Sequence, residues 1–264
     1  MAQSIPEMYG SLVFNDKVMR SKLPKDMYKA LKKTIENGTH LELDVANSVA
    51  VAMKEWATEN GATHYTHWFQ PMTNVTAEKH DSFISPTGDG QVIMDFSGKE
   101  LVKGEPDASS FPSGGLRATF EARGYTAWDP TSPAFIKDKT LYIPTAFCSY
   151  SGEALDKKTP LLRSMDVLNK EAVRILHILG NKEVRHIDTT VGPEQEYFLV
   201  DKDLYEKEKR PDLLRPYSSG RFCTQKDRKW KIITSEPLKP RVAAYMHDLD
   251  EELWKLGIPA QNKT

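Results

Sequence analysis

The spacing of apolar residues changes twice along this 264-residue chain, and these two changes constrain its fold most. The first sixty residues are predicted to be helical, with one helix from Lys25 to Asn37 that stops at Gly38. A second predicted helix reaches Asn60 and Gly61. Its apolar residues recur at helical spacing: Leu43, Ala46, Val49, Ala50, Met53, Trp56 and Ala57. The N-terminal quarter is therefore predicted to be an all-helical segment.

The pattern becomes strand-like from His64. Short aromatic or β-branched runs are separated by Gly, Pro, Ser and Asp, and the clearest of them are residues 65–69, 91–96 and 141–144. The middle third of the chain is therefore predicted to be mainly sheet and loops. Irregular connections as long as Gly104 to Ser113 are unusual in compact domains unless they are functional.

The helical pattern returns at Thr159 and Pro160, which suit an N-cap and a first helical position, and it continues to Gly180. Three more elements are predicted after it: a strand pair over 184–190 and 193–200, and a helix over 242–256. Helix, then sheet, then helix with sheet indicates an α+β fold.

Composition excludes several classes of protein. The chain has 36 basic and 37 acidic side chains, a net charge of −1, which argues against a nucleic-acid partner or an anionic membrane held by bulk charge. No apolar run approaches a membrane span, and the N-terminus lacks a signal-peptide core. Cys148 and Cys223 are far apart and are expected to be ordinary packing residues in a reduced, cytoplasmic setting. The histidines show no metal-ligand spacing.

Two glutamates stand one residue apart in the second predicted strand of the 184–200 pair. Because strand side chains alternate between faces, Glu194 and Glu196 are expected to point the same way, with Cα atoms about 6.5 Å apart. Such a pair is suited to one divalent cation or two adjacent ones. A solvated outer face of an edge strand explains the pair equally well, so the dyad alone leaves both interpretations open.

The residues around this dyad, and several further segments, resemble the type III branch of the glutamine synthetases. The matching segments are Gly192–Leu199, which resembles the Gly-Pro-Glu-x-Glu-aromatic-aromatic-Leu strand of that family, and the segments 61–71, 76–83, 104–112 and 127–133. The resemblance implies a helical N-terminal extension at 1–62, a β-grasp-like domain at 63–158 and the truncated start of a catalytic domain at 159–264.

The resemblance also implies a chemistry. Glutamine synthetases activate glutamate with ATP as co-substrate, forming γ-glutamyl phosphate, which ammonia then attacks. Glu194 and Glu196 match metal-binding glutamates of the family, whose hard oxygens suit Mg²⁺ or Mn²⁺. The segment from Asp107 to Ser110 resembles a catalytic loop whose Asp binds and deprotonates ammonium in the active site of a neighbouring subunit of a ring. Ala108 departs from the usual glycine. A turn-capping Asp with Ser hydroxyls bonded to local backbone is the alternative.

Two stretches depart from the family. Residues 214–238 have no recognised counterpart, and the chain reaches Thr264 before the expected ATP-binding residues. A piece of a longer gene, or a shift of reading frame, would account for this. Three functions are therefore considered: a glutamine synthetase chain that is inactive alone, a non-catalytic module that joins glutamine synthetase rings, and a self-sufficient ligase that acts on another amine.

Overall fold

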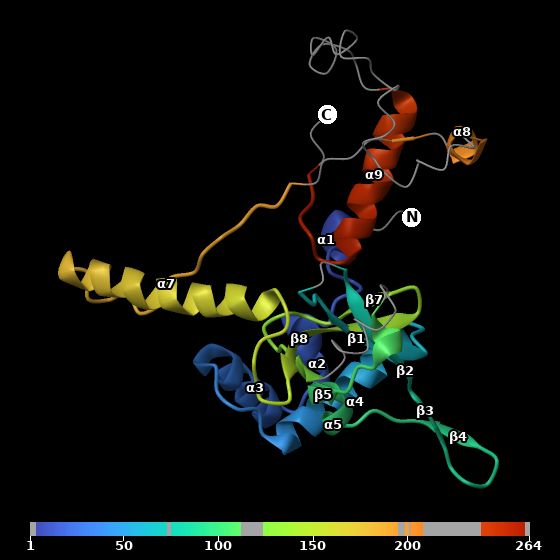
Figure 1. The fold of residues 1–264 in the computed structure, drawn as a ribbon, viewed down its shortest axis with the longest axis horizontal. Coiled ribbons are helices and arrows are strands. Elements are labelled where there is room, and N and C mark those ends of the chain that lie inside the picture. Colours follow the sequence, from blue (N-terminus) through green and yellow to red (C-terminus); the bar gives the residue numbers. More distant parts are fainter. Residues whose placement is uncertain are drawn as a thin grey trace. The chain divides into compact units, whose positions relative to one another are not determined.

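The computed structural model describes residues 4–72, 75–111, 124–194, 199–200, 202–207 and 239–261. The chain forms two compact units: Met1–Thr189 with Trp254–Pro259, and Thr190–Leu253 with Ala260–Thr264. All described strands belong to the first unit (Figure 1). Among the described residues, no helix combines the length and the apolarity that a bilayer span requires.

The first unit begins with helices, as the apolar spacing predicts. They are α1 (Ile5–Met8), α2 (Asp16–Lys22), α3 (Lys25–Asn37) and α4 (Leu43–Glu59). The Asn15 side chain caps α2 by accepting a hydrogen bond from Val18 N, and Gly38 ends α3 in the left-handed conformation with φ of 60°. The predicted ends of α3 at Gly38 and of α4 near Asn60 are therefore confirmed.

A six-stranded mixed sheet follows. Its strands are β1 (His64–Phe69), β2 (Ala77–Ser82), β5 (Lys103–Gly104), β6 (Gly124–Trp128), β7 (Phe135–Lys137) and β8 (Thr140–Ser149), in the order β2-β1-β8-β6-β5 with β7 also paired to β8. Among the described strands of this sheet, β1 and β8 pair in parallel and the other pairs are antiparallel. A separate hairpin is formed by β3 (Ile84–Pro86) and β4 (Val92–Met94), and α5 (Gly98–Val102) leads into β5.

The helices and the sheet share one hydrophobic core. Buried residues of α4, including Val49 and Met53, form a continuous cluster with Tyr65 of β1 and with Leu141 and Ile143 of β8. A smaller cluster joins Phe69, Ala77, Phe111 and Phe147. The mixed α+β class is confirmed, while the division at residues 62 and 158 and the β-grasp-like topology stay predictions.

The described C-terminal helices are α7 (Lys158–Ile178), α8 (Lys202–Lys207) and α9 (Pro240–Lys255). The predicted helices over 159–180 and 242–256 are confirmed, although the N-cap of α7 is Lys157 and not Thr159. The predicted strand over 184–190 is wrong. Its backbone binds side chains of α7 instead: Ile187 N donates to Asn169 Oδ1 at 2.8 Å. Residues 193–194 and 199–200 are also irregular, and 195–198 lie outside the described residues. A strand needs a neighbouring strand for its ladder, and none of the described strands pairs with this segment.

Two buried acidic residues attach the start of α7 to the sheet. Asp156 Oδ2 accepts a hydrogen bond from Phe147 N at 2.9 Å, and its Oδ1 accepts one from Thr159 N at 3.1 Å. Asp129, which is 7% exposed, lies 2.6 Å from Lys158 Nζ. Burial by itself would raise the pKa of Asp129, but hydrogen bonds from Lys158 and Thr131 outweigh it and hold that pKa below its ordinary value of 3.8.

This lowered pKa predicts acid sensitivity. The charged form of Asp129 is favoured in the folded state, so its contribution to stability is present above the unfolded pKa near 3.8 and is lost as pH falls through the lower folded pKa. We expect the melting temperature of the original chain to decrease when the pH is lowered below about 4. Asp129→Asn is expected to be less stable at pH 7, but its melting temperature is expected to decrease less on acidification. An equal decrease in the melting temperature of the two proteins, measured by circular dichroism, would show that Asp129 does not contribute to the acid sensitivity.

The β7–β8 hairpin gives a second prediction. Lys137 and Thr140 are register partners, and the two residues between them, Asp138 and Lys139, have φ of 49° and 60°. A left-handed conformation costs a non-glycine residue about 1–2 kcal/mol. Lys139→Gly is therefore expected to raise the melting temperature by about 2–4 °C. Lys137→Gly, at the last residue of β7, is the matched control and is expected to lower the melting temperature. A Lys139→Gly protein with a lower melting temperature than the original chain would show that the left-handed conformation is not costly here.

Candidate functional site

The loop that carries Asp107 is anchored at its N-terminal end by β5. Gly104 is the register partner of Thr126 in β6. Gly104 N donates to Thr126 Oγ1 at 3.1 Å, and the same hydroxyl donates to Gly104 O at 3.3 Å. A Cβ atom on Gly104 would lie 2.7 Å from Thr126 Oγ1 and 2.9 Å from His67 Nδ1, so the position has no room for a side chain.

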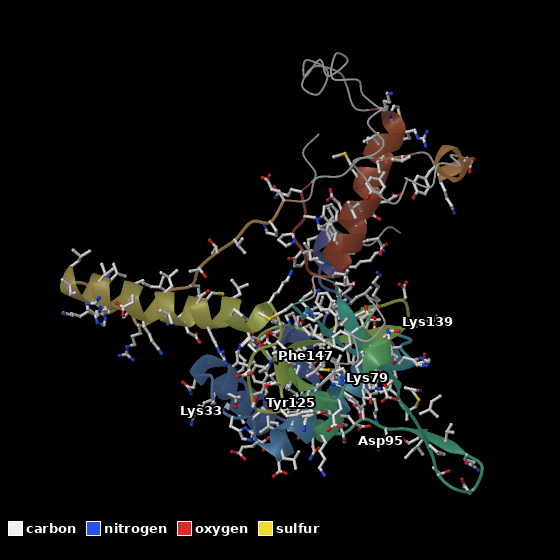
Figure 2. The ribbon with its side chains drawn as sticks, in the orientation of Figure 1. Lys33, Lys79, Asp95, Tyr125, Lys139 and Phe147 are labelled. Atoms are coloured by element: carbon white, nitrogen blue, oxygen red, sulfur yellow. The ribbon has the colours of Figure 1, made fainter. Side chains whose placement is uncertain are left out.

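The C-terminal end of the loop is anchored by an aromatic cluster. Phe111 is 3% exposed and its ring lies 5.7 Å from that of Phe69 and 5.8 Å from that of Phe147, measured between centroids. Phe147 comes from β8, the central strand of the sheet (Figure 2). Because both ends are buried, the loop between them is held by the core of the unit.

Asp107 itself is exposed at the middle of this loop. Its Oδ1 accepts hydrogen bonds from Ser109 N at 2.9 Å and from Ser109 Oγ at 2.5 Å. These bonds lower the pKa of Asp107, the Ser109 hydroxyl most, and the charge of Lys79 on β2 lowers it further. The lowered pKa keeps the carboxylate ionised at neutral pH, and Ser109 holds it through Oδ1.

Ser110 has a local structural role in the described geometry. It is 5% exposed, its hydroxyl oxygen accepts a hydrogen bond from Asp107 N at 3.2 Å, and its own N–H donates to Asp107 O at 3.1 Å. These bonds are the turn-capping arrangement considered from the sequence. They also fix the backbone of Asp107, so capping by the serines and function of Asp107 do not exclude each other. The catalytic assignment of Ser110 stays a prediction.

The predicted metal ligands lie elsewhere. Glu194 is exposed in irregular backbone of the second unit, and Glu196 lies outside the described residues. The ranges that the structure describes contain no group of three His, Cys, Asp or Glu side chains arranged to hold a metal ion. A single exposed carboxylate does not make a divalent-cation site, so the described residues alone do not fit Mg²⁺ or Mn²⁺. The shared face of Glu194 and Glu196 stays a prediction.

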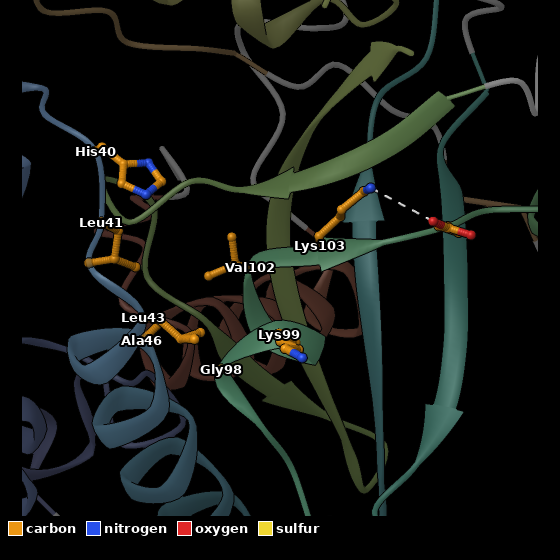
Figure 3. A pocket seen from close by; sticks show the side chains of 9 residues that line it. His40, Leu41, Leu43, Ala46, Gly98, Lys99, Val102 and Lys103 are labelled. Atoms are coloured by element: carbon orange, nitrogen blue, oxygen red, sulfur yellow. Dashed lines mark ion pairs between the residues drawn. The ribbon is translucent and has the colours of Figure 1, made fainter.

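A shallow hollow of about 440 Å³ lies beside β5 in the first unit. Figure 3 shows His40, Leu41 and Leu43 on one side of it and Lys99, Val102 and Lys103 on the other. Lys103 Nζ lies 3.7 Å from Glu105 Oε1 and 4.6 Å from the Tyr125 ring centre, so this cation is already engaged. The lining is largely apolar and contains no acid–base pair other than Lys103 and Glu105, so the hollow is not a candidate catalytic site.

Comparison with known proteins decides the family. The sequence profile of the family described as "Glutamine synthetase type III N terminal" matches residues 5–164. The chain belongs to the type III glutamine synthetase family. It is 48% identical to the glutamine synthetase of Bacteroides fragilis, 44% to the type-3 glutamine synthetase of Dictyostelium discoideum and 46% to the glutamine synthetase of Butyrivibrio fibrisolvens. The resemblance seen in the sequence is confirmed.

Coverage limits what membership in this family says about each candidate residue. Each alignment spans 99% of this chain, including residues 214–238, but only 36–37% of the relative, so the chain spans about a third of the length of these curated relatives. The matched N-terminal profile includes Asp107 and Ser110 and ends before Glu194. The Asp107 loop therefore lies in the region that matches the type III N-terminal family, whereas Glu194 and Glu196 lie outside it and their role is a proposal.

Sequence reasoning missed the residues that hold the Asp107 loop. His67 is one of the histidines without metal-ligand spacing, and it is buried, whereas His64 in the same strand is exposed. Thr126 carried no motif. The available signal was Gly104, because a glycine between a helix and a functional loop often marks a close backbone approach.

Proposed function

We propose that this chain is the N-terminal part of an enzyme that joins ammonia to glutamate with ATP, through γ-glutamyl phosphate, and that Asp107 handles the ammonium. The observation that supports this role is the state of the Asp107 carboxylate. It is held through Oδ1 by Ser109, it has a lowered pKa, and it stands exposed on a loop whose two ends are buried. The substrates in this proposal are inferred from the family to which the chain belongs.

The chemistry follows from that state. A carboxylate with a lowered pKa stays charged, so it attracts ammonium near neutral pH. The same carboxylate takes a proton from the bound ammonium, which frees the nitrogen lone pair; the resulting ammonia attacks the γ-carbonyl carbon, and phosphate leaves. Because the pKa of the carboxyl group lies well below that of ammonium, this transfer is unfavourable by itself, and the attack draws it forward by consuming the ammonia. Asp107 is therefore proposed to act first as a binding charge and then as the proton acceptor.

We further propose that Glu194 and Glu196 bind Mg²⁺ or Mn²⁺. The support for this is the sequence pair and its resemblance to the family strand, since Glu196 lies outside the described residues. When bound, such an ion neutralises phosphate charge during transfer. ATP is the proposed co-substrate, and this chain supplies no residue that we assign to it.

The proposed partner is a second copy of the chain in a ring. An exposed carboxylate on an anchored loop is suited to reach an active site formed by a neighbouring subunit. The net charge of −1 gives no support for a nucleic-acid partner or a membrane surface.

A second candidate function, a non-catalytic module that joins glutamine synthetase rings, is favoured by α7. Several of its large apolar side chains are exposed: Leu161, Val167, Leu168, Ile175 and Ile178. Exposed apolar faces of this kind mark interaction surfaces. Co-purification with a full-length glutamine synthetase, without any effect of Asp107→Asn on activity, would favour this candidate over the first.

A chimera tests the first candidate. Residues 1–213 would be joined to the portion of the Bacteroides fragilis glutamine synthetase that follows the aligned position. We expect Asp107→Asn to lower ammonia-dependent ADP release by about 10²–10⁴-fold, because the amide neither attracts ammonium nor accepts its proton. The 264-residue chain alone is expected to release no ADP.

Asp89→Asn is the matched control for this experiment. Asp89 Oδ1 also accepts hydrogen bonds from a hydroxyl, that of Thr87, and from a backbone N–H, that of Gln91, at an exposed turn with a lowered pKa. Its substitution is expected to leave ADP release unchanged. Equal activity in the Asp107→Asn and Asp89→Asn chimeras would exclude Asp107 from the reaction, and ADP release by the isolated chain would refute its expected inactivity.

Calorimetric titration with Mn²⁺ tests the glutamate pair in the chain itself. Removing one of two hard oxygen ligands is expected to weaken Mn²⁺ binding by at least about tenfold in Glu194→Gln. Glu183→Gln, an exposed residue of the first unit, is the control and is expected to bind as the original chain does. Identical titration curves for all three proteins would remove the metal assignment.

A further inference from the structure

The backbone of Gly104 is closely enclosed on the sheet side. The Thr126 hydroxyl bonds both its N–H and its carbonyl oxygen, and Thr126 is fully buried. His67 lies beneath, 3% exposed, with its Nε2 3.3 Å from Leu101 O. Burial lowers the pKa of His67, so the ring is neutral and adds no charge under the loop.

A movement of Gly104 is passed on to Asp107. Asp107 follows Gly104 by three residues, at most about 10 Å of extended chain. Pro106, the residue directly before Asp107, is buried and has a fixed φ angle. Beyond Asp107, Phe111 is held in the aromatic cluster. A short stretch fixed at both ends has little freedom to absorb a displacement at one of them.

We propose that Thr126 and His67 are positioning residues. They hold Gly104 in a seat with no room for a side chain, and through it they set where Asp107 presents its carboxylate. Neither residue contacts ammonium in this proposal; both act through Asp107. The proposal rests on the function proposed above, in which Asp107 binds ammonium, and it adds the residues that determine where that binding takes place.

Nuclear magnetic resonance on the full 264-residue chain tests the geometric part. Thr126→Val keeps the shape of the side chain but removes both hydrogen bonds to Gly104. We expect the amide signals of Asp107, Ala108, Ser109 and Ser110 to shift, and Thr126→Ser to return them to their original positions, since it restores the hydroxyl. Gly104→Ala is expected to cause larger shifts in the same signals. If Gly104→Ala does not fold, the two Thr126 variants still decide the question.

Thr145→Val is the matched control for a purely structural role. Thr145 is 1% exposed on β8, and its hydroxyl donates to Trp68 O at 3.3 Å. Its loss is expected to lower the melting temperature without moving the signals of Asp107 to Ser110. If Thr126→Val, like Thr145→Val, does not shift those four signals, Thr126 only stabilises the sheet and the proposal is overturned.

Kinetics of the chimera separate this proposal from the function on which it rests. Thr126→Val is expected to lower kcat/KM for ammonium by about 10²-fold, the cost of a misplacement of about 1 Å, while the KM for ATP stays unchanged. An equal loss for ammonium and ATP would contradict a positioning role. Shifted loop signals together with full activity of Asp107→Asn would instead overturn the proposed function and leave the positioning geometry standing.

Discussion

The candidate site depends on the close enclosure of Gly104. The Thr126 hydroxyl bonds its N–H and its carbonyl oxygen, and His67 Nδ1 would lie 2.9 Å from a Cβ atom at this position. Asp107 is exposed, so its position comes mainly from the residues on either side of it. On one side these are Gly104 and its seat on β6 and β1; on the other they are Ser110 and Phe111. An exposed carboxylate is thereby held by the same core that holds the sheet, which is the way that functional side chains gain fixed geometry without being buried.

The helices could be predicted from the sequence because their signals are local. Gly38 ends α3 and Gly180 follows α7, as the apolar spacing and the stop signals predict. Strands depend on partners that are distant in sequence, and their prediction was weaker. β8 runs from Thr140 to Ser149, longer than the predicted run, because β6 pairs with its second half. Residues 184–190 have strand-like side chains but no described strand beside them, and they bind α7 instead.

The candidate site was predictable only in part, for a related reason. Asp107 was found through a sequence motif, and its ionised, partly fixed state could be anticipated from the serines that follow it, since Ser and Asp bond locally. Gly104 signalled a close backbone approach, but its partners Thr126 and His67 could not be anticipated, because the fold of the sheet brings residues 67, 104 and 126 together. Strand alternation predicts a shared face for Glu194 and Glu196, but the described backbone at Glu194 is irregular. The metal assignment of the pair therefore rests on the resemblance to the family.

Hydrogen exchange in the original chain tests the central claim, that the Asp107 loop belongs to the core. The amides of two turns can be compared: Ser110 N, which donates to Asp107 O, and Gln91 N, which donates to Asp89 Oδ1. Residues of β3 and β4 are exposed or half-buried, whereas the Asp107 loop lies between the buried residues Gly104 and Phe111. We expect Ser110 to exchange at least about 10²-fold more slowly than Gln91, near the rate of core amides. Equal rates at the two amides would contradict the account.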